Sequence, residues 1–298
     1  NRSGPKLLRT DAGKVDRRLA VHTGGGRHIR IELVAGNDPH AIMLPALMVV
    51  RVGMIVRVIV GMMIAVGALV WIGFYSEALA HDSAVARLFR RIPKGSRILD
   101  LGVGSGVLGK LVHEQKLGLI DGIDCDTRML NRSRIFYRDL FKADLDTVGA
   151  GQIVGNRKYD IIVLADVIEH LRFPSRTLAS LSQVLERGGK LLLSVPNVTY
   201  VGVVCELASG QFNYRPEGLL DNTHLRFFSY DALKTLISES GLEVSHLDQV
   251  TMPLADSEFK HLNPADYLNL EQIMKNPNWL TYQFVAEATA TEAFFKSR

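Results

Sequence analysis

The residues best suited to chemistry surround a glycine-rich turn at 97–106, which reads Arg-Ile-Leu-Asp-Leu-Gly-Val-Gly-Ser-Gly. An apolar stretch leads into Asp100, and a helical pattern follows the turn. Glycines at such a place allow a tight turn and let a ligand approach the backbone closely. Asp124 ends the next apolar stretch, where a carboxylate can accept hydrogen bonds from ribose hydroxyls. The pattern predicts a nucleoside site formed by these two acids and by the glycines Gly102, Gly104 and Gly106.

Two kinds of nucleoside ligand fit such a turn, and the negative charge of Asp100 favours one of them over the other. Gly104, Gly106 and Gly109 also satisfy the G-x-G-x-x-G pattern of dinucleotide sites. A dinucleotide would place its pyrophosphate at this turn, close to the carboxylate, and like charges repel. S-adenosylmethionine has no phosphate, and its ammonium and sulfonium groups are cationic. We therefore expect S-adenosylmethionine as the cofactor, with a nicotinamide-dependent oxidoreductase as the alternative.

Candidate catalytic groups follow a later apolar stretch, at 159–165. Methyl transfer depends mainly on positioning, but an oxygen acceptor must also lose its proton. A histidine suits that task because its ordinary pKa is about 6.5. Glu169, His170 and, in a later loop, His224 are the predicted catalytic residues; helix capping, a cofactor contact or loop-fixing hydrogen bonds are the alternative roles. The sequence has no clustered His/Cys spacing typical of zinc, so it predicts no metal site.

The elements that would position these residues alternate along the chain from about residue 77. Short apolar stretches predict strands, and amphipathic stretches between them predict helices. Strands and helices in this order form a parallel sheet with both faces covered, whose carboxyl ends hold the ligand. The expected strands are 97–101, 119–123, 159–165, 190–195, 242–250 and 281–288, and the expected helices are 106–114, 128–137, 174–185, 230–240 and a polar region at 256–275.

These motifs resemble those of class I S-adenosylmethionine-dependent methyltransferases. The run at 100–106 resembles their first motif, with Val103 where a cysteine is usual, and Asp124 matches their ribose-binding acid. Asp144 matches their adenine-contacting acid, with Asp146 as the rival position. The resemblance implies S-adenosylmethionine as the cofactor and a Rossmann-like α/β fold. Its sheet would have seven strands, mostly parallel, with the last strand antiparallel.

Three further segments carry the resemblance, which covers about residues 78–290. Residues 159–171 resemble the fourth strand and its exit, which places Asp166 at the cofactor. Residues 185–197 resemble the fifth strand with its preceding Gly-Gly turn. Residues 220–228 resemble a segment of a bacterial subgroup linked to cell-surface polysaccharide or glycan pathways. The resemblance therefore implies a small-molecule or glycan acceptor, lipid-linked acceptors included.

The first 76 residues differ in composition from the rest of the chain. Residues 1–41 are polar and basic and predict a mobile arm. Residues 42–76 are strongly hydrophobic, and no residue from Val58 to Ser76 is charged. As a helix, that uncharged run would span about 28 Å, close to the thickness of the hydrocarbon core of a bilayer. We expect a transmembrane helix, followed at 77–298 by a methyltransferase domain that is tethered to the cytosolic face of the inner membrane.

The net charge and the cysteine content of the chain limit the kinds of partner and the compartment that we expect. The net charge is only +4, so no global field points to nucleic acid, and we expect none as a partner. The two cysteines, Cys125 and Cys205, make no disulfide framework, which fits a cytoplasmic protein. We expect an enzyme that methylates a small-molecule or glycan acceptor at oxygen. The alternative from another class is a membrane-anchored binding module without turnover.

Overall fold

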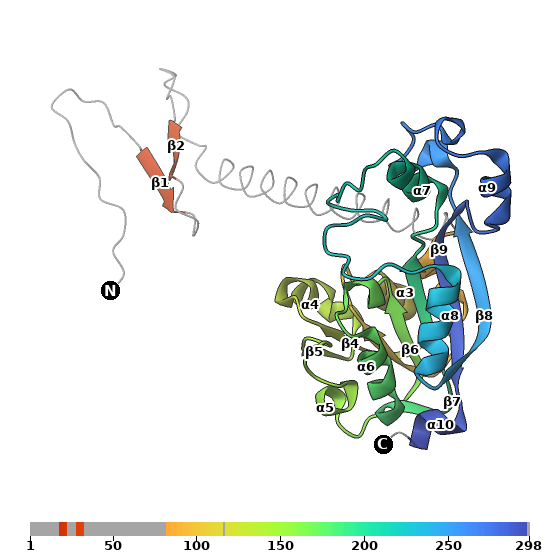
Figure 1. Cartoon of the computed structure of the whole chain (residues 1–298). Coiled ribbons are helices and arrows are strands. Elements are labelled where there is room, and N and C mark those ends of the chain that lie inside the picture. The colour runs from red at the N-terminus through yellow and green to blue at the C-terminus, as the bar shows by residue number, and fades with distance from the viewer. Residues whose placement is uncertain (1–17, 23–27, 33–81, 116, 297–298) are drawn as a thin grey trace, which may run out of the picture. The chain divides into compact units, whose positions relative to one another are not determined.

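The computed structural model describes residues 18–22, 28–32, 82–115 and 117–296 (Figure 1). The chain divides into two compact units, Asn1–Leu69 and Val70–Arg298, and the second contains the glycine-rich turn. The predicted transmembrane segment, residues 42–76, lies outside the described residues. Within the described part of the chain, no helix is both long and apolar enough to cross a membrane.

The first unit contains two short strands within residues 1–41, for which the sequence predicts a mobile arm. Strand β1 (Arg18–His22) runs antiparallel to β2 (His28–Glu32), with Arg18 opposite Glu32. The second strand reads HIRIE, in which polar and apolar residues alternate, whereas the first reads RLAVH and has three consecutive apolar residues. The period of two in HIRIE is typical of a strand, but it covers only five residues and so is not the sustained apolar period whose absence led to the prediction of an arm.

A seven-stranded sheet forms the centre of the second unit (Figure 1). The order of the strands is β5-β4-β3-β6-β7-β9-β8. Neighbours pair in parallel, except that β9 is antiparallel to both β7 and β8. This confirms the predicted Rossmann-like sheet with an antiparallel last strand. The strands are β3 (Ser96–Leu101), β4 (Gly118–Asp124), β5 (Asp139–Lys142), β6 (Tyr159–Ala165), β7 (Leu185–Pro196), β8 (Leu242–Thr251) and β9 (Thr281–Ala290).

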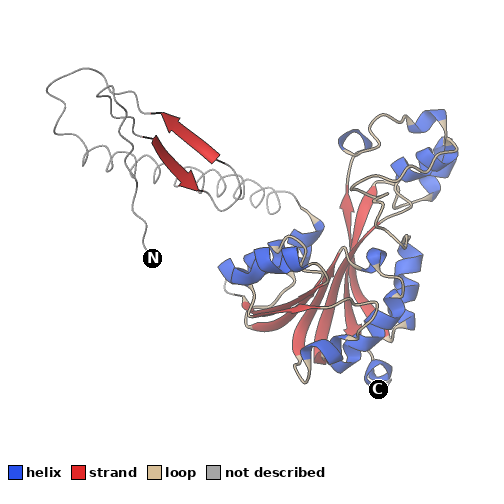
Figure 2. Cartoon of the chain, turned by 90° about the vertical axis from the view of Figure 1, so that its left-hand side faces the viewer, coloured by secondary structure: helices blue, strands red, loops and turns tan. Residues whose placement is uncertain are grey.

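Apolar residues at successive positions of the central strands explain why both faces of the sheet are covered. In β6, Ile161 and Val163 belong to one buried cluster, and Ile162 and Leu164 belong to another. Successive side chains of a strand point to opposite faces, so such a strand needs a layer on each side. Figure 2 shows helices on both sides of the sheet.

The helices divide between the two buried clusters. Ser83 and Asp126 cap the first turns of α2 and α4 through their side-chain oxygens, which accept from Ala86 N–H and Arg128 N–H. One cluster includes side chains of α2 (Ala84–Arg90), α3 (Val107–Glu114) and α4 (Thr127–Ser133). The other includes side chains of α5 (Ala150–Val154), α6 (Pro174–Ser180), α8 (Tyr230–Glu239) and α10 (Glu292–Lys296).

A third buried cluster holds together a small lobe, which we call the cap lobe and define as residues 198–228 and 252–280. It contains α7 (Val201–Ala208) and α9 (Leu270–Lys275), which lie beyond the carboxyl ends of β7 and β8 (Figure 1). The expected polar helix at 256–275 is wrong for most of its length. The structure has the 3-10 turns Leu254–Asp256 and Pro264–Asp266 there, and only α9 is α-helical.

Three other differences from the expected elements have local causes. Strand β5 was not predicted because it has four residues at the sheet edge, none of them fully buried. The expected helix at 128–137 ends at Ser133 and continues as the 3-10 turn Arg134–Phe136. The expected helix at 174–185 likewise becomes a 3-10 turn after Ser180, because β7 begins at Leu185.

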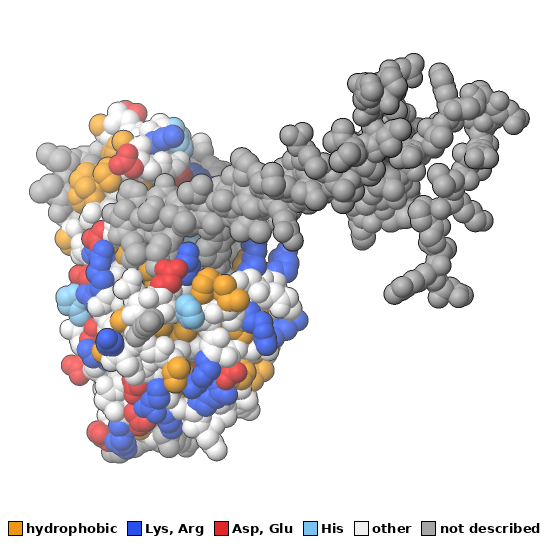
Figure 3. All heavy atoms as spheres, turned by 180° about the vertical axis from the view of Figure 1, so that it is seen from behind, with side chains coloured by type: hydrophobic (Ala, Val, Ile, Leu, Met, Phe, Trp, Pro, Cys, Tyr) orange, Lys and Arg blue, Asp and Glu red, His pale blue; other side chains and the backbone are white. Residues whose placement is uncertain are grey.

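Charged side chains of both signs are interspersed over the face shown in Figure 3. Ion pairs also join separate elements: Arg91 pairs with Asp248 at 2.5 Å, and Arg97 pairs with Asp160 at 2.6 Å. These side chains are partly exposed, and such pairs contribute roughly 0–1 kcal/mol each. The three apolar clusters therefore dominate the stability of the domain.

Candidate active site

A cleft lies where the order of the strands reverses, between β3 and its neighbour β6. Strands β3, β4 and β5 follow one another toward one edge of the sheet. Strand β6 lies on the other side of β3 and begins the other half of the sheet. Ligands of open α/β sheets bind at such a point, beyond the carboxyl ends of the strands. The cleft has a volume of about 290 Å³, near the lower end of the ~300–1,000 Å³ typical of small-molecule sites. The turns after β3, β4, β5 and β6 line it.

The turn after β3 brings the backbone to this cleft. Gly102 and Gly104 line the cleft with φ angles of 77° and 51°, in the left-handed region that favours glycine. A Cβ atom on Gly102 would lie 2.6 Å from Cγ2 of Val167, so the turn after β6 excludes a side chain there. On Gly104 it would meet nothing closer than 3.9 Å. A ligand can therefore approach the backbone at Gly104.

Asp124 is the last residue of β4 and lies next to the glycine turn after β3. Its Oδ2 accepts from Gly104 N–H at 2.9 Å, and its Oδ1 accepts from Asp126 N–H at 2.7 Å. These two bonds orient the carboxylate. A carboxylate has about four acceptor positions, so each oxygen can still accept from a ligand hydroxyl.

The three predicted catalytic residues come together beside the cleft. Glu169 and His170 lie in the 3-10 turn Ile168–His170 after β6, and His224 comes from the cap lobe. The ring centroids of the two histidines are 4.8 Å apart, edge to face. One polar side-chain atom of each residue lies within 4.8 Å of the others. His170 is partly exposed and lines the cleft, whereas Glu169 and His224 are buried.

Backbone hydrogen bonds hold the cap lobe against the turn after β6. The carbonyl oxygen of Glu169 accepts from Leu225 N–H at 2.8 Å and from Arg226 N–H at 3.0 Å. The loop-fixing role weighed for His224 is also present, because its Nδ1 lies 3.2 Å from the carbonyl oxygen of Leu219. The loop thus fixes His224, and its backbone places that ring next to His170.

Burial sets the electrostatics of this cluster. It raises the pKa of Glu169 well above its usual range, and the nearby carboxylates of Asp166 and Asp221 add to the shift. Burial also lowers the pKa of His224, and the neighbouring His170 lowers it further. Both changes favour the uncharged forms of these two side chains.

The sequence of the chain matches a family of known proteins. The family model for a methyltransferase domain matches residues 74–247, which is more than half of the chain. The chain belongs to this methyltransferase family. Its domain is that of an S-adenosylmethionine-dependent methyltransferase, and S-adenosylmethionine is the cofactor of the domain.

Individual members of the methyltransferase family are only distantly similar. A ubiquinone biosynthesis O-methyltransferase of Nitrosococcus oceani is 26% identical over 51% of this chain and 66% of its own length. One from Aromatoleum aromaticum is 23% identical over the same shares. The chain thus spans slightly less than two thirds of these relatives. A solved S-adenosylmethionine-dependent methyltransferase from Mesorhizobium loti is 17% identical over 70% of this chain and 98% of its own, with a TM-score of 0.46.

The cleft fits the cofactor of the methyltransferase family. Open space at Gly104 and the oriented carboxylate of Asp124 suit a nucleoside that carries ribose hydroxyls. The apolar lining suits a flat base; it comes from Ile123, Leu145, Val167 and Leu171. The individual cofactor contacts assigned to Asp124, Gly102 and Gly104 stay predictions.

The structure separates the two acids weighed for the adenine contact. Asp146 accepts from the backbone N–H groups of Arg172 and Phe173, at 3.0 and 3.2 Å, and so fixes the segment before α6. Asp144 is exposed, lines the cleft and accepts from Asp146 N–H at 2.9 Å. Asp144 therefore has the freer carboxylate, and its contact with adenine stays a prediction.

Asp100 and Gly106 do not line the cleft, although both were predicted cofactor residues. Asp100 is 2% exposed and accepts from the hydroxyl of Tyr137 at 2.6 Å. Burial and the charge of Asp124 raise the pKa of Asp100 to about 7, although the hydrogen bond from Tyr137 opposes the shift. Gly106 begins α3 with a φ of 77°, and a Cβ there would lie 2.3 Å from Oγ of Ser133. Packing against the next helix accounts for this glycine.

Asp166 lines the cleft in an unusual conformation. Its φ is 53°, and it is the one described residue other than glycine with a positive φ. Its Oδ1 accepts from the hydroxyl of Ser194 at 2.7 Å, and its Oδ2 accepts from Gln283 Nε2 at 3.0 Å. Sequence reasoning missed Ser194 and Gln283, because only the pairing of β7 with β6 and β9 brings them to this position. Strain of this kind is common at functional sites.

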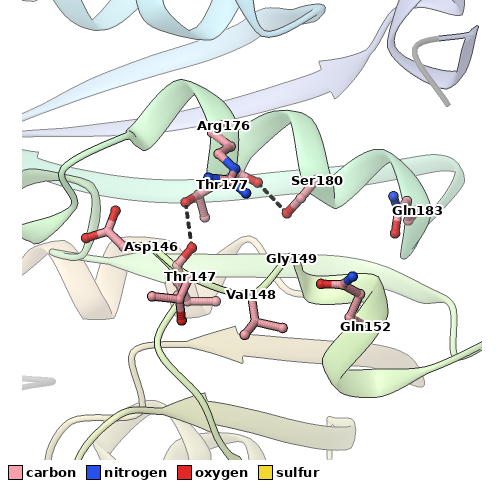
Figure 4. Close-up of a pocket in the computed structure, with 10 residues that line it drawn as sticks. Asp146, Thr147, Val148, Gly149, Gln152, Arg176, Thr177, Ser180 and Gln183 are labelled. Carbon is pink, nitrogen blue, oxygen red and sulfur yellow. Dashed lines mark hydrogen bonds between the residues drawn. The ribbon is translucent and has the colours of Figure 1, made fainter.

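A second cavity lies between the loop after β5 and helix α6 (Figure 4). It shares Leu145 and Asp146 with the cleft, but none of its lining comes from the turns after β3 and β4. Thr177 Oγ1 donates to the carbonyl of Leu145 at 3.2 Å, and Ser180 Oγ donates to the carbonyl of Thr177 at 2.7 Å. These hydrogen bonds join the loop to the helix, and we assign no ligand to this cavity.

Proposed function

We propose that the chain transfers the methyl group of S-adenosylmethionine to a hydroxyl oxygen of a small-molecule acceptor. The cluster of Glu169, His170 and His224 at the edge of the cleft carries this proposal. A neutral hydroxyl must lose its proton as the new bond forms, and a histidine next to a carboxyl group suits that task. The proposed acceptor therefore lies between this cluster and the cofactor cleft.

Different residues of the chain have different roles in this reaction. When bound, S-adenosylmethionine supplies a methyl group on a cationic sulfur, which leaves as a neutral thioether as the carbon–oxygen bond forms. Asp124 holds the ribose, and the turn at Gly104 leaves room for it. The cluster receives the acceptor hydroxyl and assists the loss of its proton. The docking of the cap lobe brings His224 to this cluster.

An aromatic patch in the cap lobe favours an acceptor that carries a ring. The rings of Tyr214 and Phe212 are 5.3 Å apart, and those of Phe212 and Phe227 are 5.6 Å apart. Phe227 in turn lies 6.4 Å from His224. Tyr214 is 56% exposed and Phe212 is 38% exposed, so this patch is open to a ligand. Edge-to-face contacts of this kind stabilise an aromatic ligand beside the cluster.

The names of the relatives support the same choice of acceptor. Both relatives described above are named as O-methyltransferases of ubiquinone biosynthesis. Neither name refers to a glycan, so the polysaccharide subgroup expected from residues 220–228 gains no support. Membership in the methyltransferase family also favours methyl transfer over nicotinamide-dependent oxidation.

Methyl transfer to a phenolic hydroxyl tests this function. The purified chain is incubated with methyl-labelled S-adenosylmethionine and a catechol or, separately, an aromatic amine of similar size. We expect labelled methyl ether from the catechol, and at least a ~100-fold lower kcat for His170→Ala. The matched control is His246→Ala, an exposed histidine of β8, which should keep the wild-type rate. Label in the amine alone would overturn the choice of oxygen.

We further propose that residues 58–76 tether the domain to the cytosolic face of the inner membrane. The support is the uncharged run in the sequence, which has the length of a bilayer span. A tether would raise the effective concentration of a membrane-dissolved acceptor at the cleft. The full chain should then sediment with membranes and resist release by alkaline carbonate. A chain that is monodisperse without detergent would contradict the tether.

A further inference from the structure

Glu169 is a buried carboxyl group whose oxygens have no partner among the described residues. The residue is 1% exposed, and neither Oε1 nor Oε2 takes part in a hydrogen bond. Burying a polar group without a partner is costly, and buried side-chain polar atoms are nearly always paired. The position therefore calls for a partner that binds from the side of the two histidines.

The hydrogen bonds of the two histidines indicate which ring nitrogen of each is left as an acceptor. Nδ1 of His224 lies 3.2 Å from the carbonyl oxygen of Leu219, which can only accept, so Nδ1 carries the proton. Nδ1 of His170 lies 3.2 Å from the carbonyl oxygen of Thr223 and 3.1 Å from its hydroxyl, whose own proton goes to Asp221. Both rings therefore leave Nε2 as an acceptor, which is the arrangement of metal-binding histidines with an outer hydrogen bond.

The charge around the cluster also favours a cation. The carboxylates of Asp166 and Asp221 lie near enough to raise the pKa of Glu169. Among the described residues, no lysine or arginine makes an ion pair with any of these three acids. Positive charge is the component that this arrangement lacks.

We propose that Glu169, His170 and His224 bind one divalent transition-metal cation beside the cofactor cleft. Two imidazole nitrogens and one carboxylate are a common ligand set for such ions, and they leave coordination positions open. The sequence predicted no metal because His224 is distant along the chain, and only the docking of the cap lobe brings it to the turn after β6.

The spacing of the side chains suits one ion after a small closure. The candidate ligand atoms lie within 4.8 Å of one another. Two ligands that each lie about 2.0–2.2 Å from one ion are at most about 4.4 Å apart. The set therefore has to close by a few tenths of an ångström to bind one ion through all three side chains. The open positions then face the cleft that His170 lines.

The role of the ion rests on the proposed transfer to oxygen, whereas the site itself does not. A divalent cation lowers the pKa of a hydroxyl that binds to it, as it does for water. The hydroxyl proton would then pass to solvent, and His170 would act as a ligand rather than as a free base. The ion would also select acceptors with a hydroxyl that can reach it.

Equilibrium dialysis of the full chain against Co²⁺ or Zn²⁺, without cofactor or acceptor, tests the site. We expect one ion per wild-type chain and at least a tenfold loss of affinity in Glu169→Gln and His224→Ala. His246→Ala should retain the ion, although its Nε2 also lies near a carboxylate, 3.1 Å from Asp248 Oδ1. Cys125→Ser should retain it too, which excludes the exposed thiol as the ligand.

Thermal unfolding shows whether a variant that does not bind the metal is still folded. The metal should raise the unfolding midpoint of the wild-type chain by several degrees, because it binds only the folded state. The same addition should leave the midpoint of Glu169→Gln unchanged. Absence of stoichiometric binding to the wild type, or equal binding by Glu169→Gln, would overturn the metal site. Methyl ether formed at the full rate in a chelator would overturn only the role of the ion.

Discussion

Asp124 contributes to cofactor binding through a carboxylate that the backbone has already oriented. We expect Asp124→Ala to weaken the binding of S-adenosylmethionine by about 1.5–3 kcal/mol, because hydrogen bonds to a charged group are lost. Asp124→Asn should lose less, since its amide oxygen can still accept. Isothermal titration calorimetry measures the effect, with Glu243→Ala on the far edge strand β8 as the control. Unchanged affinity in Asp124→Ala would refute the ribose contact.

Asp100 makes the stability of the domain depend on pH. Its pKa in the folded chain is about 7, against an ordinary value of 3.8, so the folded state holds a proton that the unfolded state has released. Stability should therefore fall as the pH rises from about 4 to 7, with a contribution of up to ~1.4 kcal/mol per pH unit from this group. Below that window the group has no effect, and above it the full cost of the buried charge is present.

Asp100→Asn should remove this contribution, because an amide does not titrate. Urea unfolding of both proteins at several pH values between 5 and 8 measures the difference. The variant should gain stability relative to the wild type as the pH rises. A constant difference across this range would show that Asp100 does not carry the shift.

At the scale of elements, the start of α3 depends on the absence of a side chain. Gly106 and Gly188 have nearly the same φ, 77° and 78°, so alanine should cost each about 1–2 kcal/mol of backbone strain. A Cβ on Gly106 would also strike Ser133, whereas one on Gly188 meets nothing within 4 Å. Gly106→Ala should therefore lower the free energy of unfolding more than Gly188→Ala, as measured by chemical denaturation. Equal losses would show that the helices adjust without strain.

At the scale of the whole domain, β9 is the strand that joins β8 to the rest of the sheet. It lies between β7 and β8 and pairs with both along its length. Its Phe284 is fully buried in the larger cluster. A chain that ends at residue 277 should lose cooperative thermal unfolding and cofactor binding, because β8 loses its sheet neighbour. A chain that ends at residue 291 keeps β9 and should remain folded, with lower stability from the loss of Phe294. A folded chain of 277 residues would contradict this view of the sheet.

The parallel sheet, the glycine turn and the acids near the strand ends could be predicted from the sequence, because these features depend on local periodicity and on the fixed order of strand, turn and helix. The sequence did not indicate which of those acids face the ligand. Asp100 belongs to the same motif as Gly104, yet its side chain turns into the core and binds Tyr137. It also did not predict the weak edge strand β5 or the form of the cap lobe.

The contacts between residues that are distant along the chain depend on how the elements pack in three dimensions. His224 reaches His170 because the carbonyl of Glu169 accepts from the backbone of Leu225 and Arg226. Ser194 and Gln283 reach Asp166 because β7 pairs with β6 on one side and with β9 on the other. Contacts of this kind depend on loop docking and strand register, and neither leaves a periodic signal in the residues themselves.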